Sequence, residues 1–160
     1  MMRPSITSRH SGFTLIEVMV ALVIFSFGLL GLVGLQGAMI KNATDAKYRS
    51  DAADLTDQIV GTIWADRGNI AQYAYNSSST QPTCVTGSSI ASGCSGSSSA
   101  TCNVENWLCE VQDSVQGPPS KQTISITGEQ VKVTVQWPAS TPSSGTTSYH
   151  SFTETADVGG

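Results

Sequence analysis

The stretch Phe13–Ile40 reads FTLIEVMVALVIFSFGLLGLVGLQGAMI, and Glu17 is its only ionisable side chain. A helical run of this length can span a lipid bilayer, which needs about 20 apolar residues. A cleaved secretory signal has an apolar region of only about 7–15 residues, so this run is too long for one. The sequence therefore predicts a retained membrane anchor with a carboxylate near its beginning.

Cations stand on both sides of this run, so charge alone does not orient it. Arg3 and Arg9 precede it, and Lys41, Lys47 and Arg49 follow it, which leaves the positive-inside comparison close to balanced. Four cysteines lie beyond the run, and cysteine-rich exported domains are typical of oxidising compartments. We therefore expect the C-terminal part to lie outside the cytoplasm.

The residues around the start of the run resemble those of type IV prepilins. The motif is GFTLIEV at 12–18, after a short basic leader, and the continuation VALVIFSFGLLGLVGLQ at 20–36 is similar to minor pilins of the PilV, or type IV pilus modification, type. The resemblance implies that prepilin peptidase cleaves after Gly12 and that the new terminal Phe13 is N-methylated. It also implies that Glu17 is the acidic residue needed for subunit assembly.

The same resemblance implies a location and a set of partners. The chain would cross the bacterial inner membrane once, keep its head in the periplasm and then enter a type IV pilus, the organelle of twitching motility and cell adhesion. Its partners would be prepilin peptidase, other minor pilins, the major pilin and a tip adhesin. Major pilins commonly have a proline partway along the helix; glycines here favour a minor pilin.

Physical chemistry gives Glu17 a compatible role. A carboxylate in an apolar span is unfavourable by up to a few kcal/mol and needs a partner, and the first helical turns favour negative charge. Cleavage after Gly12 would create an ammonium at Phe13. At about 4 Å and an effective dielectric of about 20, this pair is worth roughly 4 kcal/mol before desolvation. Alternatively, Glu17 reaches up to the lipid headgroups.

Four glycines recur every three residues along the run, and they leave two interpretations open. At 3.6 residues per turn this row drifts around the helix, so it does not form a single small-residue dimer face. The row fits either close helix packing or a stretch that unwinds when the subunit leaves the membrane, and we favour unwinding. The glycines are Gly28, Gly31, Gly34 and Gly37.

The remainder of the chain predicts an α+β head built on a continuation of the long helix. We divide the chain into a leader (1–12), a transmembrane and assembly helix (13–40), an amphipathic continuation (41–75) and a periplasmic head (76–160). The continuation has an apolar stripe at Tyr48, Ala52, Leu55, Ile59 and Ile63, spaced as on one helix face.

Around the residues of this stripe lie Asp45, Asp51, Asp54 and Asp57, which we interpret as a solvated face. Gly68 is expected to end the helix in a left-handed turn. The head begins with a Ser/Gly-rich loop over 76–101. A short helix follows with an apolar face at Val104, Trp107, Leu108, Val111 and Val115, and alternation predicts antiparallel strands near 123–126, 131–137 and 148–156.

Cysteines stand at Cys84, Cys94, Cys102 and Cys109, without a CxxC pair, which argues against zinc. A small loop-rich head would gain stability from two disulfides. If Cys102 and Cys109 share a helix, about 10.5 Å separates them, beyond the roughly 7 Å reach of a disulfide. Two pairings remain, of which we favour Cys84–Cys109 with Cys94–Cys102; free thiols are the alternative.

Composition argues against several classes of function. The net charge is −4, and residues 41–160 hold 6 Lys plus Arg against 11 acids, so no nucleic-acid surface and no DNA-uptake pilin is expected. His150 is the one histidine after the leader, and we expect no catalytic residues, no metal and no cofactor. The competing structural hypothesis is a minor pseudopilin of a type II secretion system, which shares the leader and Glu17.

Overall fold

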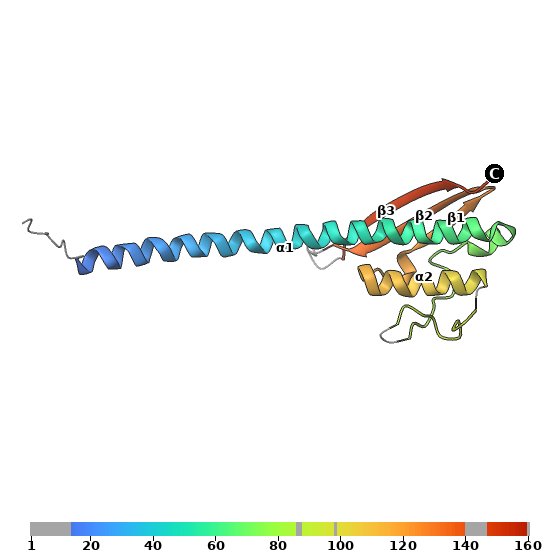
Figure 1. The fold of residues 1–160 in the computed structure, drawn as a ribbon, viewed down its shortest axis with the longest axis horizontal. Helices are drawn as coiled ribbons and strands as arrows, with labels where there is room; N and C mark the ends of the chain where they lie inside the picture. The colour runs from blue at the N-terminus through green and yellow to red at the C-terminus, as the bar shows by residue number, and fades with distance from the viewer. Residues whose placement is uncertain (1–13, 86–87, 98, 140–146, 160) are drawn as a thin grey trace, which may run out of the picture. The chain divides into compact units, whose positions relative to one another are not determined.

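The computed structural model describes residues 14–85, 88–97, 99–139 and 147–159. Contacts divide the chain into two compact units, Met1–Lys41 and Asn42–Gly160, and helix α1 contributes residues to both. The elements are α1 (Leu15–Ala65), the 3-10 helix η1 (Arg67–Tyr73), α2 (Ala100–Val115), the 3-10 turn η2 (Pro119–Lys121), β1 (Thr123–Thr127), β2 (Gln130–Pro138) and β3 (Tyr149–Asp157) (Figure 1). The expected α+β, pilin-like fold is confirmed.

The second half of α1 supplies one wall of the head's core. The predicted stripe is confirmed, because Ala52, Leu55, Ile59 and Ile63 are buried and Tyr48 packs against them at the margin. Thr56 is also fully buried, and its hydroxyl donates to the carbonyl oxygen of Ala52 at 2.7 Å. The 3.6-residue period of apolar side chains therefore places this part of α1 in the head.

The end of α1 differs from the expectation in its backbone conformation. The α-helix ends at Ala65, close to the expected end at Gly68, and η1 follows it. Gly68 does not have a positive φ, so the predicted left-handed turn is wrong. Instead the Asp66 N–H donates to the carbonyls of both Thr62 (3.2 Å) and Ile63 (3.1 Å). This shared hydrogen bond tightens the last turn into the 3-10 helix without a left-handed residue.

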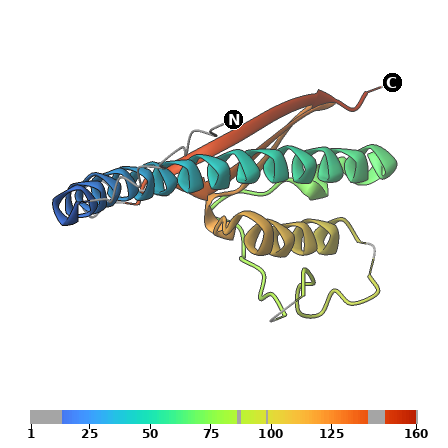
Figure 2. The same cartoon turned by 60° about the vertical axis from the view of Figure 1, so that its left-hand side comes forward.

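Helix α2 runs alongside the second half of α1 (Figures 1 and 2). It begins where the Ser99 hydroxyl accepts a hydrogen bond from the Cys102 N–H (3.3 Å), an N-cap that satisfies one free donor. In α2, the indole Nε1 of Trp107 donates to the Leu55 carbonyl oxygen of α1 at 2.8 Å. The predicted apolar face of the short helix is confirmed, since all five of its residues are buried: Val104, Trp107, Leu108, Val111 and Val115.

The three strands form one antiparallel sheet in the order β1-β2-β3. Thr134 in the central strand pairs with Thr123 on one side and Thr153 on the other. Gly128 has a φ of 63° in the tight turn between β1 and β2, where a residue without a side chain is favoured. One face of the sheet contributes Ile124, Val131, Val133, Val135 and Trp137 to the core.

A buried glutamine continues the β1–β2 ladder beyond the first residue of β1. The Gln122 side chain is fully buried, and its Oε1 accepts from the Gln136 N–H at 2.8 Å. Its Nε2 donates to the carbonyl oxygens of Gln136 and Pro118, both at 3.0 Å. Gly117 lies against this group, and a Cβ there would clash with the Gln136 carbonyl oxygen. The amide side chain thus takes the place of a paired backbone peptide.

Tyr75 is a buried tyrosine whose hydroxyl has no hydrogen-bond partner among the described residues. The residue is only 5% exposed, its backbone pairs with Ile124, and burial raises the pKa of its phenol. An unpaired buried hydroxyl carries a desolvation penalty of about 1–3 kcal/mol. We expect Tyr75→Phe to raise the free energy of unfolding by up to about 1 kcal/mol, measured by thermal unfolding. Tyr73→Phe is the control and should be destabilising, because the Tyr73 hydroxyl bonds both Asp66 and Asn103.

Candidate functional site

Glu17 lies in the first turn of α1, where its backbone N–H donates to the Thr14 carbonyl oxygen at 3.1 Å. Its side chain is exposed, and so are its neighbours Leu15, Ile16 and Val18. The cleavage-site residues Gly12 and Phe13 lie outside the described residues. The structure therefore places the carboxylate at the beginning of the helix, where the N-terminal end of the helix dipole favours a negative charge.

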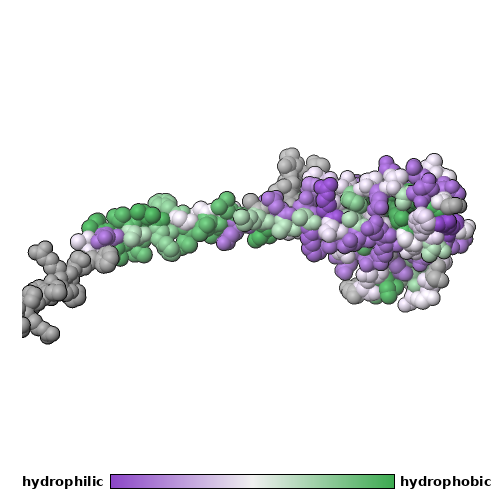
Figure 3. Space-filling model, turned by 45° about the horizontal axis from the view of Figure 1, so that its top comes forward, coloured by the Kyte–Doolittle hydropathy of each residue, from purple (hydrophilic) through white to green (hydrophobic). Residues whose placement is uncertain are grey.

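The part of α1 within the first unit is apolar around its whole circumference. The large apolar side chains of residues 15–40 are between 46% and 79% exposed, and they cover this segment in Figure 3. An 18-residue window in α1 has a mean hydropathy of 2.6, none of it buried, so the helix is long and apolar enough to cross a membrane. A surface this apolar requires cover from lipid or from other apolar chains.

The four glycines of this segment are helical and pack against nothing else among the described residues. Apart from the helix's own adjacent backbone, no described heavy atom lies within 4 Å of a Cβ built on Gly28, Gly31, Gly34 or Gly37. The described helix is continuous through all four positions. Contacts among the described residues therefore do not explain their presence.

Two disulfides hold the loop before α2 against that helix. Cys84 pairs with Cys109 and Cys94 pairs with Cys102, with Cα–Cα distances of 5.5 and 5.3 Å. This is the pairing we favoured, and its geometric premise holds because both Cys102 and Cys109 lie within α2. A backbone bridge between Cys84 and Ala91 and a bond from the Ala91 N–H to the Asn106 side chain (2.8 Å) add to this attachment.

The two disulfides should differ in their contributions to stability. They close loops of 25 and 8 residues, for which chain entropy gives about 3.5 and 2.5 kcal/mol. Replacing both Cys84 and Cys109 by Ala is therefore expected to lower the unfolding midpoint more than replacing Cys94 and Cys102. Non-reducing peptide mapping checks the pairing, and thermal unfolding checks the order; four alkylatable thiols in freshly extracted protein would contradict both.

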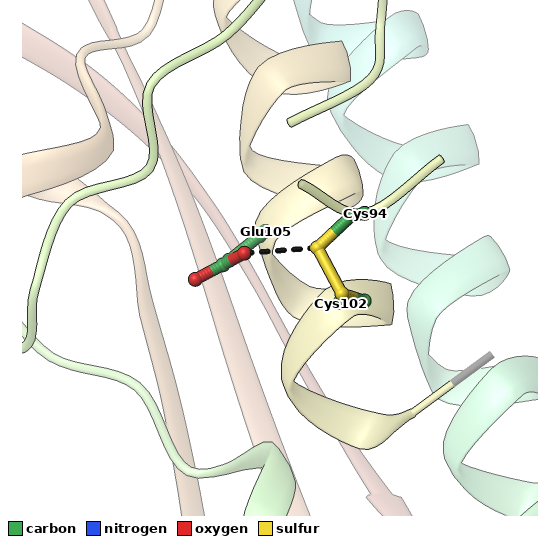
Figure 4. Close-up of side chains that lie close together, drawn as sticks. All are labelled: Cys94, Cys102 and Glu105. Atoms are coloured by element: carbon green, nitrogen blue, oxygen red, sulfur yellow. Dashed lines mark hydrogen bonds between the residues drawn. A yellow bond between two sulfur atoms is a disulfide. The ribbon is translucent and has the colours of Figure 1, made fainter. Parts of the chain in front are cut away.

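Glu105 lies beside the second disulfide, and Figure 4 shows its carboxylate directed at Cys94. Glu105 Oε2 is 3.0 Å from Cys94 Sγ, and Cys102 completes a group whose ligand-type atoms all lie within 4.8 Å of one another. Metal binding by cysteine requires thiolates, whereas these two sulfurs are bonded to each other. In this oxidised form the group is a disulfide with an adjacent carboxylate.

We had expected the acidic residues of α1 to form a solvated face, but not all of them do. Asp51 is paired with Lys47 at 2.6 Å on the surface, and this hydrogen bond raises the pKa of the Lys47 ammonium. Asp45, by contrast, accepts a hydrogen bond from Trp137 Nε1 (3.1 Å) and lies 3.7 Å from His150 Nε2. The His150 ring stacks on the Trp137 indole with centroids 6.1 Å apart. Asp45 thus connects α1 to the sheet.

A second carboxylate of α1 also meets the sheet. Partial burial, together with the nearby Asp57 carboxylate, raises the pKa of Glu154 in β3. The sequence does not predict that Asp57 and Glu154 are neighbours, because 97 positions separate them. Alternation along β3 does predict the orientation of Glu154 alone, since it lies on the same face as Phe152 and Ala156, which pack against the core.

Comparison with known proteins supports one assignment. Residues 7–33 match the family model of the prokaryotic N-terminal methylation motif, and this range contains Gly12, Phe13 and Glu17. No curated protein and no solved structure matches the chain significantly. The motif implies processing by prepilin peptidase and assembly with pilins at a membrane. Together with the apolar helix and the α+β head, it supports a type IV pilin-like protein.

Proposed function

We propose that this chain is a minor pilin of the PilV type that takes part in the initiation, assembly or tip structure of type IV pili. It crosses the bacterial inner membrane once, with its head in the periplasm, before it enters the filament. The observation that carries the proposal is the methylation motif over 7–33, which overlaps an exposed apolar segment at 15–40 whose single charge, Glu17, lies in the first turn of α1. The role is structural rather than enzymatic.

The exposure of the first unit explains why such a subunit needs two successive environments. Its apolar residues are covered by lipid while the chain is in the membrane, and by the helices of neighbouring subunits once it is assembled. Glu17 suits the same sequence of events, since an amine at Phe13 would neutralise it when lipid headgroups and water are no longer near. Partners are accordingly other minor pilins, the major pilin and a tip adhesin.

The mature chain is expected to begin at Phe13 with one added methyl group. A protease can approach the Gly12 carbonyl closely because glycine has no side chain, so Gly12→Val should leave most of the chain uncleaved. Mass spectrometry of membrane-extracted protein from peptidase-positive cells measures the N-terminus. An intact leader in such cells, or a start near residue 38, would contradict the processing step.

Location in the filament is tested separately from processing. Pili sheared from intact cells should contain the protein at a level far below the major pilin, and chemical crosslinking should join it to other minor pilins. Crosslinks to the pseudopilins of a type II secretion system, with no protein in sheared pili, would instead establish the pseudopilin alternative. Both filaments use the same N-terminal motif, so only this comparison separates them.

A further inference from the structure

The outer edge of β3 is open. β3 pairs with β2 through nine consecutive residues, from Tyr149 opposite Pro138 to Asp157 opposite Gln130. Among the described residues no strand or bridge pairs with its other side. The opposite edge of the sheet is different, because there the Tyr75 backbone exchanges two hydrogen bonds with Ile124 of β1.

The hydrogen-bond pattern determines which residues of β3 face this open edge. In antiparallel pairs, backbone groups point alternately towards and away from the partner strand. Just beyond the paired region, the Ala139 N–H bonds the Ser148 carbonyl at 2.9 Å, and at the other end the Val158 N–H bonds the Glu129 carbonyl at 2.8 Å. The even-numbered residues of β3 therefore bond β2, and five others direct their N–H and C=O groups outwards: Tyr149, Ser151, Thr153, Thr155 and Asp157.

β3 carries one of the features that protect an exposed edge. Proteins block such an edge with lysine, proline, a β-bulge or an inward-pointing charge, and on β3 the inward-pointing charge is Glu154. β3 reads YHSFTETAD, without lysine or proline, and its register with β2 is unbroken over all nine pairs. A free, regular edge of nine residues is long enough to accept an added strand, because natural strands have about 5–6 residues on average.

The side chains beside the edge indicate what kind of strand would fit. Glu154 lies on the core-facing side of β3 with Phe152 and Ala156, and the charge of Asp57 on α1 acts on its carboxyl group. Among the described residues the ion pairs are Lys47–Asp51 and His150–Asp45, and neither includes Asp57 or Glu154. Phe152 and Ala156, two positions to either side of Glu154, are only partly buried. This face of β3 is therefore acidic at its centre and apolar on both sides.

We propose that the outer edge of β3 accepts an antiparallel strand from a partner subunit, and that this strand carries Lys or Arg opposite Glu154 with an apolar residue two positions to either side. The residue opposite Glu154 would occupy a non-hydrogen-bonded pair, where Cα atoms are about 4.5 Å apart and side chains lie closest. A cation there neutralises both carboxyl groups, and its apolar neighbours cover Phe152 and Ala156. The inference rests on the proposed function only in taking the partner to be another pilin.

Photocrosslinking in intact cells tests this geometry. A photoreactive phenylalanine analogue replaces Ser151, Thr153 or Thr155, one at a time, and Thr134 in the central strand serves as the control position on the same face. Attachment sites from the three edge positions should step by two residues, in reverse order, along one segment of one partner with a Lys or Arg between them. The control position should not label that segment.

Two substitutions, each with a control, test the contacts, with Thr155 as the crosslinking position. Thr153→Pro removes an outward N–H and should reduce the crosslink at least tenfold, whereas Thr153→Val keeps the N–H and should not. Glu154→Lys should reduce the crosslink about tenfold, because it places a lysine opposite the cation of the added strand. Asp54→Lys, a charge reversal on α1 rather than on β3, should have no effect. Scattered attachment sites, attachment to a second copy of this chain, or full crosslinking in Thr153→Pro would overturn the proposal.

Two further measurements on the same cells distinguish failure of this inference from failure of the proposed function. Processed protein and its amount in sheared pili are measured beside the crosslink. A stepped crosslink in the membrane fraction of cells whose pili lack the protein would overturn the pilus assignment and retain strand addition. Normal incorporation without the stepped crosslink would retain the pilus assignment and overturn strand addition.

Discussion

Substituting Glu17 by alanine should leave the protein inserted and processed but reduce its incorporation into filaments by about 100-fold or more. The carboxylate is the one charge of an otherwise apolar segment, so its removal makes the anchor more compatible with lipid. Cleavage should proceed, because the side chain lies five residues beyond Gly12. Assembly would then bury the Phe13 ammonium without its counter-charge, and leaving one partner of a buried ion pair unpaired costs about 3–5 kcal/mol.

The measurement compares processed protein in the inner membrane with protein in sheared pili. Val18→Ala is the matched control, since it shortens an exposed apolar neighbour in the same turn and should be incorporated normally. Glu17→Asp retains the charge on a shorter side chain and should be intermediate. If Glu17→Ala protein enters pili at the normal level, the carboxylate only reaches towards the headgroups, and charge pairing with the terminal amine must be abandoned.

Substituting Gln122 by leucine should lower the free energy of unfolding of the head by about 2–4 kcal/mol. The side chains are similar in size, but the change removes all three hydrogen bonds of a fully buried amide. The Gln136 N–H and C=O would be left without these partners, whereas the Pro118 carbonyl oxygen keeps its bond from the Lys121 N–H. Unsatisfied buried groups are more costly than the average hydrogen bond is favourable. For a head of this size the midpoint should fall by about 10 °C or more.

Thermal unfolding of the detergent-solubilised chain, followed by near-ultraviolet circular dichroism of its buried tryptophans, measures this change. Gln130→Leu is the control, because Gln130 is an exposed residue at the start of β2. Gly117→Ala should also be destabilising, since its new Cβ would stand 2.7 Å from Gln122 Nε2. A midpoint for Gln122→Leu within 2 °C of the unchanged chain, an interval of about 0.5 kcal/mol or less, would show that solvent replaces the lost bonds.

Much of the fold could be predicted because its signals are local. The spacing of Ala52, Leu55 and Ile59 on one helix face and the alternation of Val131, Val133 and Val135 each reflect a backbone period that is independent of the rest of the chain. The end of α1 was predicted less well. Gly68 permits a left-handed turn, but the shared hydrogen bond at Asp66 produced a 3-10 helix instead, and such competing local bonds have no distinctive sequence pattern.

The sequence by itself determined the apolar segment, its single carboxylate, the α+β class and, from the length of a helical turn, that Cys102 and Cys109 do not pair. Only the tertiary structure decided that Gln122 substitutes for backbone in the ladder and that Asp57 meets Glu154. It also decided that β3 lies at the edge of the sheet, with no strand on its outer side among the described residues. The physical reason is that periodicity reports which face of an element is apolar, whereas polar partners and sheet edges depend on which distant segments the packed core brings together.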